Sequence, residues 1–373
     1  MNRQIELLVE RAIEGEEFAI NGLEGIRQRN NPNELWWVAV LYQDRKKYAE
    51  AAEWYSLAAA QYDCASISCL ATMYCEGKGV EKNEVEGVRL YRLAAEMGDV
   101  IAMYQLGSCY DDGTGVEQSY SEALKWFMRS AEGCYPFAYS IIGKYYLCGL
   151  GVKQDYAKAI EWLRKSEDTS PISRLYLGVC YHKGWGVDQD YKMALKYFMQ
   201  TVNMTTAPST PLIYYMDAEF YIGEYYRLGL GVDKDYEESA NWYHLAAEQG
   251  HCEAQYYLWA FYDEGKGVEQ NAEEGIKWLR LSAENGNAEA QYMLGKFYYQ
   301  GYIVEENVEE TIKWFRCAAE QGHCEAQFYL WAFYDAGEGV EQNTEEAQKW
   351  LLLAAEQGHE KAIELLEEES DEK

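Results

Sequence analysis

The chain has 373 residues, of which 48% are hydrophobic, and it carries a formal net charge of −30. This charge repels nucleic acid and anionic membrane surfaces, so it favours a neutral or basic protein or peptide partner. The first residues lack the apolar core of a secretory signal, and no stretch of about 18 apolar residues could span a membrane. We therefore expect a soluble cytoplasmic protein with no nucleic-acid or membrane partner; its oligomeric state is left open.

Composition also bears on fold and redox state. With 34 Tyr and 12 Trp but only 5 Pro, the chain is expected to be helical with few long loops. No pair spacing recurs among the ten cysteines, which favours reduced thiols packed as small side chains over a disulfide framework. They are Cys64, Cys69, Cys75, Cys109, Cys134, Cys148, Cys180, Cys252, Cys317 and Cys324.

In chain order, residues 1–32 are expected to form N-terminal capping helices, and 33–62 a helix pair with a loop four residues shorter than those that follow. From 63 to 358 a unit of about 36 residues repeats eight times, marked by a Gly-x-Gly-Val loop that is degenerate in one copy. The loops begin at Gly77, Gly113, Gly149, Gly184, Gly229, Gly265, Gly301 and Gly337. Residues 359–373 are expected to form a C-terminal capping helix and an acidic tail.

Each loop is flanked by the patterns of two helices. Seven residues before the loop stands Leu or Ile, and three before it stands Tyr, a spacing that places both on one helix face. The first Gly is expected to end the first helix in the left-handed conformation. Three residues after the loop Val comes a residue that can cap the second helix, followed in six copies by Glu at the capping-box spacing. An aromatic anchor follows on the second helix in most units, so we expect Tyr262 and Trp278 to be core residues.

These residues together resemble the Sel-one-like repeat (SLR), a relative of the tetratricopeptide repeat. The pattern A-x-Y-x-L-G-x-x-Y-x-x-G-x-G-V covers most of the eight units, and 33–62 is similar to a shortened, tetratricopeptide-like unit. The resemblance implies an all-α fold, a right-handed superhelical solenoid of antiparallel helix pairs. It also implies a concave, partner-binding surface lined by the first helices.

Two features that could indicate chemistry are better explained by structure. His251-Cys252 and His323-Cys324 are two units apart, on the order of 20 Å, so they cannot share one zinc ion, and each pair alone supplies too few ligands. We expect them to start helices. A phosphate-binding use of Gly-x-Gly would need a preceding strand, which is absent from the pattern. No catalytic, cofactor-binding or metal residues are predicted.

Candidate partner-binding residues are those that the repeat does not require. Tyrosines eight residues before the loop and charged residues five before it should face the concave side, although such tyrosines could equally be half-exposed packing. Tryptophan also replaces glycine six before the loop in two units, where it must push a neighbour away or project into the groove. The predicted site is Tyr176, Tyr221, Glu224, Tyr257, Trp259, Lys296, Tyr329 and Trp331.

One interval between loops is 45 residues, which places about nine extra residues near 201–213. Pro208 and Pro211 exclude a regular helix there. The insertion is equally well explained as a functional loop or as a tolerated surface insertion.

The favoured function is a non-enzymatic scaffold that binds a protein or peptide in an aromatic and acidic groove, as adaptor or regulator. An alternative within the same class is an immunity or inhibitor protein that neutralises a basic toxin or effector. The alternative from another class is a β-lactam-binding or β-lactam-hydrolysing enzyme, an activity associated with cysteine-rich relatives. This chain lacks their regular cysteine pair in every unit.

Overall fold

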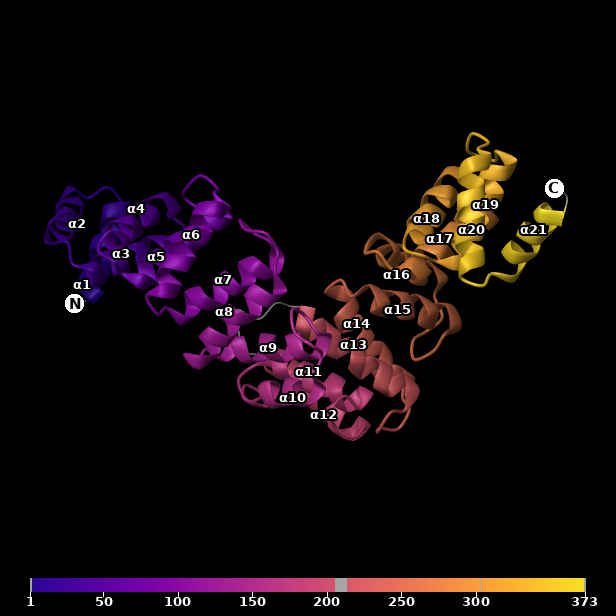
Figure 1. Ribbon diagram of the computed structural model, residues 1–373, viewed down its shortest axis with the longest axis horizontal. Helices are drawn as coiled ribbons and strands as arrows, with labels where there is room; N and C mark the ends of the chain where they lie inside the picture. Colours follow the sequence, from indigo (N-terminus) through magenta and orange to yellow (C-terminus); the bar gives the residue numbers. More distant parts are fainter. Residues whose placement is uncertain (1, 205–212, 303, 372–373) are drawn as a thin grey trace. The chain divides into compact units, whose positions relative to one another are not determined.

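The computed structural model describes residues 2–204, 213–302 and 304–371, and every regular element within them is an α-helix (Figure 1). These helices fall into two compact units, described separately below. Unit 1 comprises Met1–Tyr176 and Trp185–Val187, and unit 2 comprises Leu177–Gly184 and Asp188–Lys373. Consecutive helices pack against each other within each unit, which confirms the predicted all-α solenoid of helix pairs.

The helices of unit 1 are α1 (Asn2–Ile13), α2 (Glu17–Arg29), α3 (Pro32–Asp44), α4 (Tyr48–Ala59), α5 (Cys64–Glu76), α6 (Glu84–Glu96), α7 (Val100–Asp112), α8 (Tyr120–Glu132), α9 (Pro136–Cys148) and α10 (Tyr156–Arg164). Helix α11 (Pro171–Lys183) contributes residues to both units. The helices of unit 2 are α12 (Tyr191–Val202), α13 (Ile213–Leu228), α14 (Tyr236–Glu248), α15 (Cys252–Glu264), α16 (Ala272–Glu284), α17 (Ala288–Gln300), α18 (Val308–Glu320), α19 (Cys324–Ala336), α20 (Thr344–Glu356) and α21 (Glu360–Asp371). Residues 205–212, which hold the prolines of the predicted insertion, lie outside the described residues.

The turn inside each repeat is built as its residues predict. The first loop glycine has a positive φ in all eight copies, for example +66° at Gly265, and its N–H donates to the carbonyl four residues back. The predicted caps accept hydrogen bonds from N–H groups in the first turn of the second helix. They are Asn83, Ser119, Asp155, Asp190, Asp235, Asn271, Asn307 and Asn343.

The capping-box interpretation is only half right. A capping box returns a bond from the Glu side chain to the cap's own N–H. Here that N–H donates instead to the carbonyl of the tyrosine three residues before the loop, as from Asn271 to Tyr262 at 2.9 Å. Five of the six Glu carboxylates pair with a cation three residues on, as Glu274 does with Lys277 at 2.8 Å, and Glu238 accepts a hydrogen bond from the indole N–H of Trp242. The backbone hydrogen bond from the cap residue to the tyrosine thus links the two helices of a repeat.

The histidines of the His-Cys pairs begin helices, as expected. Nδ1 of His251 accepts from the N–H of Ala254 at 3.3 Å, and His323 caps α19 in the same way. A neutral imidazole is required for this role, since Nδ1 must accept. Burial lowers the pKa of His251, which favours that form.

Glycines six residues before the loop give space to an aromatic or leucine side chain of the second helix. A Cβ added at Gly223 would lie 2.7 Å from the Tyr243 ring, and one at Gly295 would lie 2.7 Å from Phe315. The expected close approach therefore exists, and a side chain makes it. Helix formation loses about 1 kcal/mol at each such glycine, which the packing of a fully buried ring offsets.

The core lies between the second helix of one repeat and the first helix of the next. One cluster joins Ala240 and Tyr243 of α14 to Leu258 and Phe261 of α15, and homologous clusters recur along unit 2. Tyr243 and Phe315 are fully buried. Tyr262 and Trp278, by contrast, are half-buried. The expectation that Tyr262 forms the core was wrong, because this tyrosine lies at the edge of the packed face. Trp278 does pack against the Tyr243 cluster, although it is not fully buried.

Substitution should reveal this difference. We expect Phe315→Ala to lower the free energy of unfolding by about 3–5 kcal/mol, because it empties a fully buried ring site. Tyr262→Ala should cost less than about 2 kcal/mol, since only part of that side chain leaves water. Denaturant unfolding measures both, and hydrogen exchange should confine the Phe315 effect to neighbouring repeats. Equal losses in the two variants would contradict this assignment of the core.

Candidate functional site

Three of the predicted tyrosines occupy equivalent positions on first helices of unit 2. We call Tyr221 of α13, Tyr257 of α15 and Tyr329 of α19 the tyrosine row. Each ring stacks on the buried aromatic residue of the preceding second helix, and each remains partly exposed. The centroid distances are 4.7 Å for Tyr221–Phe198, 5.3 Å for Tyr257–Tyr243 and 5.1 Å for Tyr329–Phe315. Each tyrosine ring therefore packs against the core on one side and remains partly exposed to solvent, so the two roles that the sequence left open occur together.

The buried aromatic residue of each of these second helices packs both against a glycine of its own repeat and against a tyrosine of the tyrosine row. Tyr243 lies against Gly223 of its own repeat and stacks on Tyr257 of the next. Phe198 likewise packs against Gly178 and stacks on Tyr221. Phe315 packs against Gly295 and stacks on Tyr329. In these three repeats a single buried side chain thus positions a partly exposed tyrosine of the next repeat.

Trp259 and Trp331 follow a different packing rule. The residue at the second-helix ring position is Leu279 or Leu351 in these repeats, and each Trp packs in the cluster that contains that leucine. Trp259 also meets Phe297 edge-on at 6.0 Å. A smaller residue on the second helix thus accommodates the large side chain in each of these repeats. Both tryptophans are half-buried.

The remaining predicted residues differ in their surroundings. Glu224 pairs with Arg227, with its Oε1 2.7 Å from Nε, and accepts a hydrogen bond from the hydroxyl of Tyr243. The Lys296 ammonium lies 5.4 Å from the centroid of the Tyr292 ring. Tyr176 is half-buried on α11 and belongs to unit 1, so it is described apart from the others.

A row of carboxylates accompanies the tyrosine row. Asp217, Glu253, Glu289 and Glu325 follow at intervals of 36 residues on successive first helices, and their side chains are 38%, 53%, 63% and 54% exposed. We call them the acidic row. Burial, with the neighbouring charge of Glu253, raises the pKa of Asp217 to about 6. Ionising this carboxyl therefore requires a higher pH than for a solvated aspartate, and a cation placed beside it would favour the ionised form.

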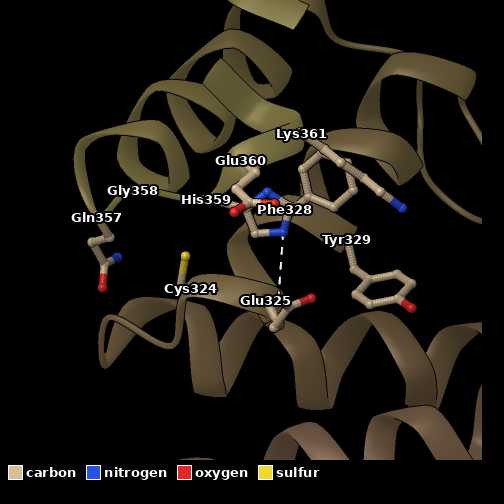
Figure 2. A pocket seen from close by; sticks show the side chains of 9 residues that line it. All are labelled: Cys324, Glu325, Phe328, Tyr329, Gln357, Gly358, His359, Glu360 and Lys361. Carbon is tan, nitrogen blue, oxygen red and sulfur yellow. Dashed lines mark ion pairs between the residues drawn. The ribbon is translucent and has the colours of Figure 1, made fainter. Parts of the chain in front are cut away.

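A cavity of about 630 Å³ lies where the acidic row meets α21 (Figure 2). Its lining includes Glu325, Phe328 and Tyr329 of α19 together with His359 and Lys361. Figure 2 shows Glu325 directed toward His359, and the two form an ion pair of 3.5 Å when the imidazole is protonated. Phe328 stacks on the same imidazole at 4.2 Å. The cavity thus offers an aromatic wall beside exposed charges.

Sequence reasoning missed several residues around these features. His359 and Lys361 belong to the expected C-terminal cap, and Arg227, Lys234 and Lys266 line a smaller cavity beside Tyr257. Arg227, Lys234 and Lys361 depart from the residues that several other repeats carry at the same positions, whereas His359 repeats the position of His251 and His323. Across the described ranges, no group of three or more His, Cys, Asp or Glu side chains is arranged to hold a metal ion. None of the helices described is both long and apolar enough to cross a bilayer.

Comparison with known proteins shows the family. The model of the Sel1 repeat matches nine segments: residues 38–63, 69–99, 100–133, 136–168, 171–199, 217–251, 252–287, 288–323 and 324–359. No curated protein matches the chain.

Solved structures agree with this match. A protective antigen of uropathogenic Escherichia coli with an SLR fold is 31% identical, with a TM-score of 0.64 over 97% of this chain and 78% of the other. A Sel1 repeat protein of Oxalobacter formigenes is 31% identical, with a TM-score of 0.59 over 85% of this chain and 89% of the other. An immunity protein of Pseudomonas aeruginosa is 20% identical, with a TM-score of 0.40 over 60% and 81%. The chain belongs to the Sel1 repeat family.

Proposed function

We propose that this Sel1 repeat protein is a non-enzymatic scaffold that binds a protein or peptide partner along the first-helix face of unit 2. Members of the family typically mediate protein–protein interactions. The observation that carries the proposal is the tyrosine row: three tyrosines at one repeat position, each held by a buried ring and each still partly exposed. Rigid, amphipathic aromatic side chains bind with little loss of conformational entropy and are preferred interface anchors.

The acidic row supports a partner that is basic where it meets this face. Its carboxylates are between 38% and 63% exposed, and burial together with the charge of Glu253 raises the pKa of Asp217. Nε2 of His251 lies 3.6 Å from Oδ1 of Asp217 and compensates that charge only when the imidazole is protonated. An Arg or Lys side chain placed there would gain a charge-assisted hydrogen bond and relieve that repulsion. The net charge of −30 would further speed association with such a partner.

The other predicted residues take secondary parts in the proposal. Trp259 and Trp331 contact the partner only with the edges that packing leaves exposed, so they mainly shape the face. Glu224 holds Arg227 beside Tyr257, and Lys296 covers Tyr292. Tyr176 would contribute through unit 1.

The same surface chemistry would serve an adaptor, a regulator or an inhibitor of a basic toxin, so the identity of the partner decides among these functions. Nitrocefin hydrolysis by the purified protein would contradict the non-enzymatic assignment.

The tyrosine row can be tested with residues that the repeat already tolerates. Another repeat of unit 2 carries Met293 at the position of Tyr257 and Tyr329. We expect the double variant Tyr257→Met/Tyr329→Met to keep the fold, because Met packs well against Tyr243 and Phe315. Affinity for a partner isolated by pull-down and mass spectrometry should fall by at least about 2 kcal/mol, the scale of a binding hot spot.

Leu281→Glu is the matched control, since Leu281 lies on a second helix and is 41% exposed. It should leave the affinity unchanged. If the double variant binds normally and deletion of residues 205–211 abolishes binding, the site belongs to the insertion instead.

Binding to the acidic row should depend on pH. The carboxyl of Asp217 has its pKa raised to about 6, so it is ionised above that pH and progressively neutral below it. We therefore expect affinity for a basic partner to weaken between pH 7.5 and 5.5, by up to about fivefold for this one pair. Asp217→Asn should weaken binding at pH 7.5 and flatten the profile in calorimetric titrations. Tighter binding at pH 5.5 would exclude a cation at this position.

The dependence of the binding kinetics on salt distinguishes long-range electrostatic attraction from contacts within the complex. We expect an increase from 50 to 500 mM NaCl to slow association with the partner more than it speeds dissociation, because screening removes long-range attraction before it removes packed contacts. Stopped-flow or surface-plasmon kinetics would measure both rates. An association rate that is independent of salt would rule out the proposed role of the net charge.

A further inference from the structure

One small cavity of unit 2 has the opposite charge to the rest of the chain. It has a volume of about 180 Å³ and lies between the loop that follows α13 and the end of α15. Its charged lining consists of Arg227, Lys234 and Lys266 against a single carboxylate, Glu264, and its aromatic lining includes Tyr236 and Tyr257. We call it the cation pocket. In a chain with 63 acidic and 33 basic residues, three cations around one cavity need an explanation.

Lys234 replaces a residue that has a structural task in other repeats. Five repeats carry Gln at this position, five residues after the first loop glycine, and its Nε2 donates to the carbonyl of the residue two before that glycine. In the repeat closed by Gln270, for example, the bond to the carbonyl of Asp263 measures 2.6 Å. Lys234 instead places its ammonium 5.1 Å from the centroid of the Tyr236 ring. Among the described residues, no ion pair joins Lys234 to a carboxylate. The loop thus lacks the hydrogen bond that Gln makes elsewhere and carries instead a cation that contacts Tyr236.

Arg227 stands where three other repeats have aspartate, and it is held in place. Nε and Nη2 each lie 2.7 Å from an oxygen of Glu224, and Nε also donates to the hydroxyl of Tyr243 at 3.1 Å. The guanidinium carbon lies 4.7 Å from the centroid of the Tyr257 ring. Because a guanidinium has five N–H donors, these bonds leave further donors for a ligand. Arg227 is therefore a positioned cation beside the tyrosine row.

Lys266 is brought to the pocket by the close packing of two loops. It lies between Gly265 and Gly267, and a Cβ at Gly267 would fall 2.0 Å from the carbonyl oxygen of Tyr236. Only glycine permits this approach, which sets the Lys266 ammonium 5.9 Å from the Tyr236 ring centroid. Lys266 also pairs with Glu264, but both side chains are about half exposed, so the pair is weak and can be exchanged.

The pKa of the Tyr236 hydroxyl reflects the positive charges around it. A hydrogen bond from Lys234 lowers the pKa of Tyr236, and the charges of Lys266 and Arg227 act in the same direction. The environment thus favours a negative charge at this point of an acidic protein. Arg227 is paired with Glu224 and Lys266 with Glu264, so the excess positive charge of the pocket is that of Lys234, and carboxylates more than about 8 Å away are screened at physiological salt.

We infer that the cation pocket binds the carboxylate of an aspartate or glutamate side chain of the partner, next to the surface that Tyr257 offers. Arg227 and Lys234 would donate charge-assisted hydrogen bonds to the carboxylate oxygens, and Lys266 would exchange Glu264 for the incoming group. The partner would then be neutral or basic along the acidic row and acidic at one position. Such a combination selects one sequence register, because a basic side chain placed in the cation pocket would be repelled. The inference rests on the proposed function, since it assumes a polypeptide on this face.

The test uses a small probe, so that its outcome is independent of the partner. N-acetylglutamate N-methylamide should shift the amide signals of Gly265 and Gly267 in ¹H–¹⁵N TROSY spectra at low salt, and N-acetylglutamine N-methylamide should not. Lys234→Gln, which restores the residue of five other repeats, should fold normally and weaken probe binding about tenfold, the scale of one lost charge-assisted hydrogen bond. Lys82→Gln is the matched control, because Lys82 holds the same repeat position in unit 1 and pairs with Glu84 at 2.8 Å.

Equal shifts with the two probes, or unchanged binding by Lys234→Gln, would overturn the inference. If inorganic phosphate binds tenfold more tightly than the glutamate probe, a phosphorylated partner is indicated and the carboxylate assignment is wrong. Failure of the probe combined with loss of partner binding in Tyr257→Met/Tyr329→Met would reject the cation pocket and leave the proposed function standing.

Discussion

The aromatic ring at one position of the second helix is the interaction on which the solenoid and its candidate binding face both depend. In unit 2 the ring of Tyr243 occupies the space left by Gly223 and supports Tyr257 of the following repeat. In unit 2 the three positions change together, whereas in unit 1 Gly143 accommodates a leucine, Leu163, and the next repeat still carries Tyr176. Where Trp259 replaces the glycine, Leu279 replaces the ring, and the next repeat carries Met293 in place of tyrosine. The exposed tyrosines are therefore a consequence of how the core is filled.

Much of this architecture could be predicted because it repeats. A glycine that must adopt positive φ and a side chain that must cap a helix are local requirements, and eight copies made them visible at Gly265 or Asn271 alike. The core face was predicted less well. Tyr262 is as regular as Leu258, yet it is half-buried, because a period locates a helix face without fixing where that face ends.

The candidate site could be predicted only in part. Composition and position identified the tyrosine row, but the stacking of Tyr257 on Tyr243 joins two repeats, and no pattern within one repeat contains it. The cation pocket was missed for a related reason. Arg227 and Lys234 are separate departures from the repeat and Lys266 stands at a variable position, and only folding places the three around one cavity. A net charge of −30 describes long-range attraction, whereas recognition at contact depends on the few groups within a screening length.

The central claim is that a partner lies on the first helices of unit 2, and hydrogen–deuterium exchange with and without the isolated partner measures this most directly. Because α13, α15 and α19 each carry a tyrosine and a carboxylate of the proposed face, the account predicts added protection in peptides from these helices. Peptides from the second helices α14, α16 and α18 should exchange as in the free protein. Protection confined to second helices, or to the segment around residues 205–212, would contradict the account.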